Sequence, residues 1–200
     1  MANIVLASGN RGKVREFNQL LQPRGYQVIP QTDLGVSEAL ESGLSFVENA
    51  IIKARNASAQ TGEAALADDS GLEVDFLGNS PGIYSARYAG EGASDSDNVA
   101  KLLRELEGVI DLSERSARFQ CVLVFLKHEH DPTPIICQES WEGSITLQPQ
   151  GENGFGYDPI FWVEQYQCTA AELSPEQKNR LSHRGRAMQQ LLQKLPLAEA

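Results

Sequence analysis

Residues 3–21 read NIVLASGNRGKVREFNQLL, and this stretch decides the fold class. The apolar run at residues 4–7 is flanked by Gly9, which is typical of a short buried strand. Apolar side chains then recur at helical spacing over residues 14–21, and Pro23 and Gly25 end that helix. The order of strand, glycine-bearing turn and helix favours an α/β fold.

The middle of the chain adds a different pairing. Residues 117–126 predict a long strand, the prolines at 132 and 134 predict a turn, and residues 135–141 predict a returning strand. Strand–helix units favour parallel pairing, whereas a hairpin forces antiparallel pairing. We therefore expect a mixed central β-sheet with flanking helices. Because no linker is long enough to separate two independent domains, residues 1–200 are predicted to form a single domain.

The sequence also predicts the secondary-structure elements around the acidic tetrapeptide DDSG, residues 68–71. Ser45 and Glu48 fit a capping box ahead of a helix at residues 46–60. Residues 64–67 predict a strand that runs directly into DDSG, and residues 72–76 predict another short strand. The tetrapeptide is thus expected to lie at the end of a strand, where open α/β sheets bind ligands.

Composition limits the possible classes of protein. The sequence is 41% hydrophobic and 22% charged, as in ordinary globular proteins, and no apolar run approaches the roughly 20 residues of a membrane span. The net charge of −10 disfavours nonspecific binding to nucleic acid. The N-terminus lacks a secretory signal, and three widely spaced cysteines suit reduced, mostly buried thiols. We expect a cytoplasmic protein with no nucleic-acid or membrane partner.

The segment SGNRGK, residues 8–13, invites comparison with a phosphate-binding P-loop. A P-loop requires four residues between its glycines and a Ser or Thr after the lysine. Here two residues separate Gly9 from Gly12, and Val14 follows Lys13. Backbone N–H groups at the start of a helix can still bind an anion. The alternative is a plain strand-to-helix turn with solvated basic side chains.

Adjacent carboxylates at Asp68 and Asp69 suggest metal chemistry. Such a pair is costly to bury without a cation, and Mg²⁺ prefers oxygen ligands, often one or two carboxylates together with substrate phosphates. A second carboxylate could then orient or deprotonate water. The alternative is an Asx-type turn stabilised by these side chains. Glu41, Glu38 and Glu48 are further candidate ligands, although the capping box already explains Glu48.

Two later segments could bind a planar ring. In GFGYDP, residues 154–159, an aromatic and an acid lie between glycines, although a bulged turn with core aromatics is the alternative. Lys178 and the segment SHRG, residues 182–185, could donate hydrogen bonds to a carbonyl, or form a solvated basic patch. His128 and His130 could ligate a metal but suit a solvated hairpin tip.

Taken together and in order, six segments resemble one family. They are SGNRGK, ESGLSFVENAIIKA, ADDSGLEVD, PGIYSARYAG, GFGYDPIF and LSHRGRA. The chain is similar to the inosine triphosphate pyrophosphatase family, in its bacterial dITP/XTP diphosphatase branch, from residue 4 to about residue 195. The resemblance implies hydrolysis of dITP, ITP and XTP to the monophosphate and pyrophosphate, which removes deaminated purines from the nucleotide pool. It also implies Mg²⁺ dependence, a homodimer, and one ITPase-like domain with two lobes and a central active-site cleft.

The resemblance also assigns roles to individual residues. Its catalytic residues are Asp69, Asp68 and Lys13, and its metal ligands are Glu41 and Asp69. Lys53 is implied to reach the phosphates and Ser70 to touch substrate, whereas the role of Arg87 is left open. The implied substrate-binding set is Ser8, Gly9, Asn10, Arg11, Gly12, Lys13, Lys53, Ser70, Phe155, Gly156, Tyr157, Asp158, Lys178, His183 and Arg184.

A mechanism follows from these roles. Asp69, alone or with Asp68, would activate water for attack on the α-phosphorus, and nearby cations would stabilise the leaving pyrophosphate. Arg184 or a backbone donor would face the purine 6-carbonyl, and Asp158 or a backbone carbonyl would accept from a ring N–H, so that adenine is rejected. Two alternatives remain at this point: a pyrophosphatase for modified pyrimidine nucleotides, and a module that binds ITP without hydrolysing it.

Overall fold

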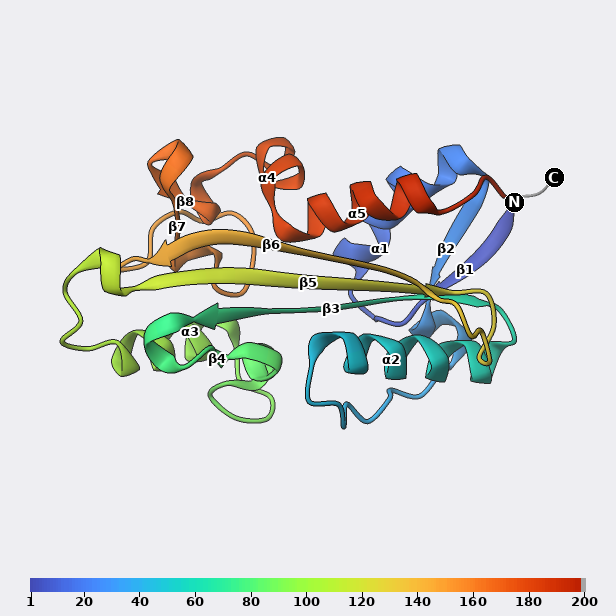
Figure 1. Ribbon diagram of the computed structural model, residues 1–200, viewed down its shortest axis with the longest axis horizontal. Coiled ribbons are helices and arrows are strands. Elements are labelled where there is room, and N and C mark those ends of the chain that lie inside the picture. The colour runs from blue at the N-terminus through green and yellow to red at the C-terminus, as the bar shows by residue number, and fades with distance from the viewer. Residues whose placement is uncertain (199–200) are drawn as a thin grey trace. The chain divides into compact units, whose positions relative to one another are not determined.

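The computed structural model describes residues 1–198, which divide into two compact units. The first unit comprises Met1–Asp69, Val122–Gln138 and the chain from Ala187, and the second comprises Ser70–Cys121 and Glu139–Arg186. Three long strands contribute residues to both units (Figure 1): β3 (Ala64–Val74), β5 (Ser116–Leu126) and β6 (Ile135–Ile145). The strands follow the order β2-β1-β3-β5-β6-β7-β8, and β4 pairs with β3.

The first unit begins with the predicted strand, turn and helix. These are β1 (Ala2–Leu6), α1 (Arg11–Leu21) and β2 (Tyr26–Pro30), followed by α2 (Phe46–Thr61). β1 pairs in parallel with both β2 and β3. Its residues Ile4, Val5 and Leu6 are fully buried, because helices cover both faces of a parallel sheet. The predicted α/β organisation is confirmed here.

Helix α2 confirms its predicted start. The Ser45 hydroxyl accepts a hydrogen bond from the backbone N–H of Glu48, and the Glu48 carboxylate accepts one from the backbone N–H of Leu44. These bonds satisfy donors that a helix N-terminus would otherwise leave unpaired. Gly62, with a φ of 73°, ends the helix in the left-handed conformation that glycine adopts without strain.

The prediction that DDSG interrupts two short strands is wrong. β3 runs without a break from Ala64 to Val74, so Asp68 and Asp69 lie in the middle of a strand. Charged side chains disfavour such a position when they lack partners. Here lysines from two helices neutralise the two carboxylates, so the strand continues through them instead of ending in a solvent-exposed turn.

The second unit holds the antiparallel part of the sheet. β3 pairs with β4 (Ser80–Pro81), β6 pairs with β7 (Phe161–Val163), and β7 pairs with β8 (Cys168–Thr169), all antiparallel. β6 continues to Ile145, beyond the predicted end at residue 141. The helices of the second unit are α3 (Asp95–Glu105), α4 (Pro175–Leu181) and the first turn of α5 (His183–Lys194). The mixed sheet is therefore confirmed.

The junction between α4 and α5 depends on Gly185. A Cβ atom on Gly185 would collide with the backbone oxygen of Asn179, so only glycine fits. Ser182 separates the helices with an extended backbone, and its hydroxyl accepts from the Gly185 N–H, 3.1 Å away. This junction places His183 and Arg184 at the start of α5.

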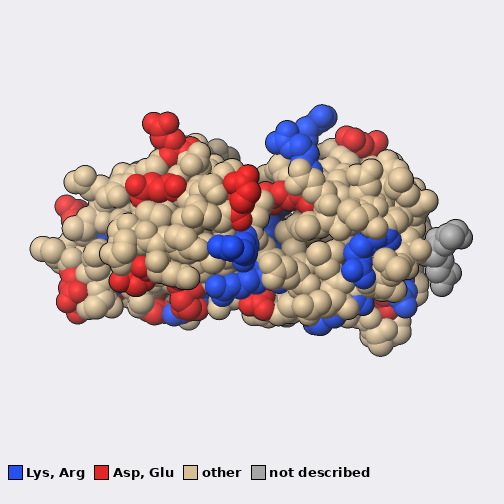
Figure 2. Space-filling model, turned by 90° about the horizontal axis from the view of Figure 1, so that it is seen from above, with Lys and Arg blue, Asp and Glu red and all other residues tan. Residues whose placement is uncertain are grey.

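Surface charge is mixed on the face drawn in Figure 2. Lys and Arg gather in short groups beside Asp and Glu, and on this face the described residues form no continuous basic stripe. No helix within residues 1–198 has the length and apolar character needed to cross a membrane. The three cysteines are thiols, two of them buried, as predicted.

Candidate active site

Residues 8–13 form the turn into α1. The Asn10 side chain caps the helix by accepting from the N–H groups of Gly12 and Lys13, at 2.9 and 3.2 Å. The Asn10 N–H in turn donates to the Ser8 hydroxyl, 3.1 Å away. Arg11 is exposed at the first helical position. An anion arriving at this helix end would therefore meet a preformed turn and would compete with Asn10 for the first amides.

Lys13 reaches from α1 to the buried carboxylate of Asp68. The ammonium lies 3.1 Å from Asp68 Oδ1, and the Asp68 side chain has no exposed surface. The Lys13 side chain keeps 18% of its surface exposed. A buried carboxylate is thus compensated by a cation that solvent and small ligands can still reach.

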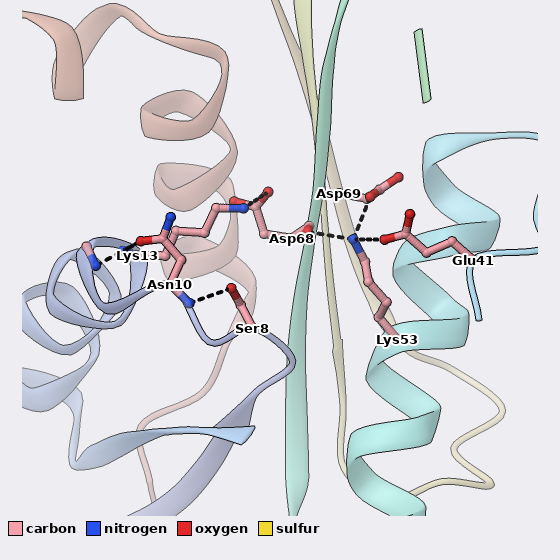
Figure 3. A network of polar contacts seen from close by, with 8 residues as sticks. Ser8, Asn10, Lys13, Glu41, Lys53, Asp68 and Asp69 are labelled. Atoms are coloured by element: carbon pink, nitrogen blue, oxygen red, sulfur yellow. Dashed lines mark hydrogen bonds and ion pairs between the residues drawn. The ribbon is translucent and has the colours of Figure 1, made fainter. Parts of the chain in front are cut away.

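On the other face of β3, Lys53 of α2 gathers three oxygen atoms (Figure 3). Its ammonium lies 2.5 Å from Asp69 Oδ1, 3.1 Å from Glu41 Oε1 and 3.1 Å from the backbone oxygen of Asp68. Glu41 comes from the irregular segment that precedes α2. One ammonium therefore holds together the two carboxylates expected to bind metal.

The carboxylates of the neighbours Asp68 and Asp69 lie on opposite faces of β3. Successive side chains of a strand point to opposite faces, so Asp68 turns toward α1 and Asp69 toward α2 (Figure 3). Each carboxylate contacts its own lysine. Asp69 has the more open position, since 11% of its side chain is exposed against none of Asp68.

Burial and charge shift the pKa values of the Lys53 and Asp69 pair. Burial raises the pKa of Asp69, and the nearby Glu41 and Asp68 carboxylates act in the same direction against the attraction of Lys53. Burial alone would lower the pKa of Lys53, but the Asp69 and Glu41 charges outweigh it and raise the pKa. Lys53 is therefore a firmly charged cation between two carboxylates.

Glu41 and Asp69 suit a magnesium ion. A full positive charge already bridges the two carboxylates, which shows that their oxygens converge on a position that favours a cation. Within residues 1–198, no group of three or more His, Cys, Asp or Glu side chains is arranged to hold a metal. Mg²⁺ is usually bound by one or two protein carboxylates and completes its coordination shell with waters and substrate phosphates, so this pair of carboxylates suits it.

The second unit organises the segment GFGYDP around Asp158. Its Oδ2 accepts from the Phe155 N–H at 2.8 Å and also pairs with the Lys178 ammonium. Gly154 has a φ of 80°, and a side chain there would strike this same carboxylate. Oδ2 already contacts both the loop and Lys178. The hydrogen bond that we expected Asp158 to accept from the purine ring would therefore go to its other oxygen, Oδ1.

Phe155 presents an aromatic face beside two cations. Half of its surface is exposed, whereas Tyr157 is buried and donates to the backbone oxygen of Ser85. The Lys178 ammonium and the Arg184 guanidinium lie 4.8 and 5.5 Å from the centre of the Phe155 ring. A planar ligand could stack on this ring within reach of both donors. The alternative prediction, that the aromatic side chains of this segment belong to the core, is therefore wrong for Phe155 and correct for Tyr157.

Several neighbours of these residues had no sequence signal of function. Gly156 donates to the Asp95 carboxylate at the start of α3, 2.7 Å away. Phe119 and Trp141 stack on His183, yet their alternating pattern in the sequence indicates only core strands. Sequence spacing cannot reveal such contacts, because the partners come from elements far apart in the chain.

Three further candidate residues, Ser70, Arg87 and His130, lie on β3, in the segment before α3 and in the hairpin loop, respectively. Ser70 is half-buried on β3, immediately after Asp69. Arg87 pairs with Glu91 at 3.7 Å and lies over the Tyr84 ring. His130 is exposed beside Glu129 at the hairpin tip, in keeping with the solvated alternative.

These observations define a class: a mixed α/β protein with one cluster of lysines and carboxylates suited to phosphates and a metal, and another suited to a planar ring. The chain belongs to the Ham1 family, whose model matches residues 4–194. The predicted family is thereby confirmed, since Ham1 relatives carry the dITP/XTP pyrophosphatase name.

Individual relatives are similar over almost their whole length. A "dITP/XTP pyrophosphatase" of Photobacterium profundum is 58% identical over 96% of both chains. One from Shigella flexneri is 57% identical over 98% of both chains. The solved structure of a HAM1 protein from Coxiella burnetii is 52% identical, with a TM-score of 0.92, and the match covers 97% of this chain and 98% of that one.

Proposed function

We propose that this protein is a nucleoside triphosphate pyrophosphatase that hydrolyses dITP, ITP and XTP to the monophosphate and pyrophosphate. It would thereby remove deaminated purine nucleotides from the pool. The observation that carries the proposal is the Lys53 ammonium bridging Glu41 and Asp69 on one face of β3, while Lys13 from the turn of residues 8–13 pairs with Asp68 on the other face (Figure 3). Relatives that are 57–60% identical bear the dITP/XTP pyrophosphatase name.

The first unit has the chemistry to bind the phosphates. Lys13, Lys53 and the helix N-terminus at residues 10–13 supply positive charge in a protein whose net charge is −10. Arriving phosphate oxygens would draw both ammonium groups away from their carboxylates. Asp69, released from Lys53, would then accept the proton of the attacking water.

Glu41 and Asp69 would hold Mg²⁺, which supplies positive charge to the phosphate oxygens when bound. Attack on the α-phosphorus makes pyrophosphate the leaving group, and the lysines stabilise the negative charge that develops on it. Before the nucleotide arrives, the buried Asp68 carboxylate holds the Lys13 ammonium through their direct contact.

The second unit has the chemistry to bind a 6-oxopurine. Phe155 offers a stacking face, and Arg184 and Lys178 lie beside it as donors. A purine with a 6-oxo group would accept a hydrogen bond from such a donor, whereas the 6-amino group of adenine would meet it with another donor. Sites built on this kind of hydrogen bond can discriminate by roughly 10⁴–10⁵-fold.

A nucleotide panel tests the proposal. ITP, dITP, XTP, GTP, ATP and modified pyrimidine triphosphates are incubated with the purified protein, with and without Mg²⁺, and monophosphate and pyrophosphate are measured. We expect Mg²⁺-dependent release of pyrophosphate from the first three. Preferred hydrolysis of modified pyrimidine nucleotides would identify the alternative enzyme, and binding of ITP without product would identify a sensor.

Isotope labelling tests the site of attack. In water enriched in ¹⁸O, attack on the α-phosphorus places the label in the monophosphate. Attack on the β-phosphorus places the label in pyrophosphate instead, and this result would overturn the assigned mechanism.

We further propose that the two units act as one ITPase-like domain in a cytoplasmic homodimer. The family match from residue 4 to residue 194 supports a single functional domain. Light scattering coupled to size exclusion measures the mass in solution, which is about twice the chain mass of 21.9 kDa if the protein is a dimer.

A further inference from the structure

His183 lies in an aromatic environment within the second unit. It is the first residue of α5, and only 5% of its surface is exposed. Phe119 of β5 and Trp141 of β6 both stack on its imidazole. The side chain therefore packs against aromatic rings and is largely shielded from solvent.

Phe119 makes the closer and more parallel contact. Its ring centre lies 4.8 Å from the imidazole centre, with 12° between the planes, whereas Trp141 lies 6.4 Å away at 22°. The χ2 torsion of a histidine is broad, so rotamer preference alone does not set the plane of its ring. A parallel ring stacked at this distance does set that plane.

The Phe119 ring is itself held in position. It is 7% exposed and contacts Phe161 of β7 at 4.5 Å between ring centres, and Phe161 also contacts Trp141 at 5.1 Å. The two rings that stack on His183 are those of Phe119 and Trp141, and Phe161 packs against both of them. Phe119 thus connects the packed core of the second unit to the imidazole.

We propose that Phe119 is a positioning residue that sets the plane of the His183 imidazole and thereby the selectivity for 6-oxopurines. The inference rests on the proposed function and takes His183, the neighbour of Arg184 at the start of α5, as a member of the substrate-binding set that the resemblance implies. Phe119 covers one face of the imidazole and only 5% of the residue is exposed, so the nitrogen atoms at the ring edge are the groups through which His183 would contact a ligand. The ring plane then decides whether that edge meets the purine.

The variants Phe119→Leu and Phe161→Leu form a matched pair. Both shorten one buried aromatic of the same cluster, but only the first removes the ring that stacks on His183 at 4.8 Å. We expect Phe119→Leu to lower the ratio of kcat/KM for ITP to that for ATP by roughly tenfold, because a displaced donor lowers catalysis steeply. Phe161→Leu should lower the melting temperature similarly while keeping the ratio within about twofold of wild type.

A double-mutant cycle tests whether Phe119 acts through His183. If it does, adding Phe119→Leu to His183→Gln will change the ITP-to-ATP ratio no further than His183→Gln alone. Independent, additive losses would overturn the proposal. So would an unchanged ratio in Phe119→Leu, or an equal loss in Phe161→Leu.

Proton NMR tests the positioning without any nucleotide. The chain has three histidines, and the other two, His128 and His130, are exposed, so the His183 ring signals stand apart. Stacking on Phe119 should shift these signals upfield, and Phe119→Leu should move them toward ordinary values while Phe161→Leu does not. Unmoved signals would overturn the positioning role. Failure of the wild-type protein to hydrolyse ITP would instead overturn the proposed function.

If Phe119→Leu does not fold, Phe119→Tyr keeps the stacked ring and provides the second variant. It should retain both the upfield signals of His183 and the wild-type ratio. Loss of the ratio with the signals in place would show that the plane of the imidazole does not govern selectivity.

Discussion

The charged cluster of the first unit and the aromatic cluster of the second are held together in different ways. Lys13 and Lys53 pair with carboxylates and keep 18% and 16% of their side-chain surface exposed. Phe119, Trp141 and His183 are buried and hold one another through stacked rings. Ion pairs that solvent reaches can exchange partners when a charged ligand arrives, whereas packed rings keep their geometry.

This difference matches the two tasks that we assign. Phosphates and a metal bring their own charge, and they can displace an ammonium from a carboxylate. A purine brings a pattern of donors and acceptors, and it is recognised only if the protein groups are already placed. Variants in the first unit should therefore affect all triphosphates alike, and variants in the second should affect the choice of base.

The largest expected effect concerns Asp69. Asp69→Asn removes the proposed base, and we expect kcat to fall by roughly 10²–10⁴-fold for every nucleotide. Asp68→Asn is the matched control, because it changes the neighbouring carboxylate on the other face of β3. Its loss should be smaller, and steady-state kinetics of both variants measures the difference. Equal losses would show that the two carboxylates act together despite facing apart.

The next effect concerns Arg184. Arg184→Ala should lower the ratio of kcat/KM for ITP to that for ATP by about a hundredfold, because a charged donor to the 6-oxo group is lost. Lys13→Met should raise KM for both nucleotides by the same factor and leave the ratio unchanged. A changed ratio in Lys13→Met, or an unchanged one in Arg184→Ala, would break the proposed division of tasks.

A smaller effect concerns the competition between Lys53 and a metal. The Lys53 ammonium bridges Glu41 and Asp69, so Lys53→Met should leave two carboxylates in need of a cation. We expect Mn²⁺ to bind the nucleotide-free Lys53→Met variant about tenfold more tightly than the wild-type protein, because the lysine charge that competes with the metal is gone. Electron paramagnetic resonance of free Mn²⁺ measures this affinity without reference to activity.

Lys13→Met serves as the control for this binding experiment. Its ammonium contacts Asp68, so its removal should leave the Mn²⁺ affinity near that of wild type. Unchanged or weaker binding in Lys53→Met would mean that Glu41 and Asp69 are not the metal ligands.

The smallest effect concerns the stability of the loop around Asp158. Gly154→Ala combines a φ of 80° with a collision against the Asp158 carboxylate, and we expect a loss of about 2 kcal/mol. Gly78→Ala meets open space at a φ of 59°, and it should cost only about 1 kcal/mol. Urea denaturation compares the two, and an equal loss would show that the loop yields to the added methyl group.

Some errors in the sequence interpretation have a clear physical origin. The DDSG tetrapeptide carries typical turn residues, yet it lies inside β3 because Lys13 and Lys53 neutralise its carboxylates from two helices. Local propensity cannot include partners that lie 55 and 16 residues away in the chain. The same limit hid Phe119, whose spacing in β5 indicates a core strand and nothing more.

Other features depended on local rules alone. The N-cap of α2 at Ser45, the turn at residues 8–13 and the interruption between α4 and α5 all follow from short-range spacing of polar residues and glycines. Ordered motifs along the chain were enough to indicate the family, which the match over residues 4–194 confirms.

The sequence by itself therefore determined the α/β class, the mixed sheet, the start of α2 and the family, because periodicity, capping and ordered motifs are local properties of the chain. Only the tertiary structure decided which face of β3 each aspartate takes, that Lys53 joins Glu41 to Asp69, and that Phe119 stacks on His183. Contacts of this kind arise where separate elements pack together, and their energies depend on distance and burial, which no pattern within one segment specifies.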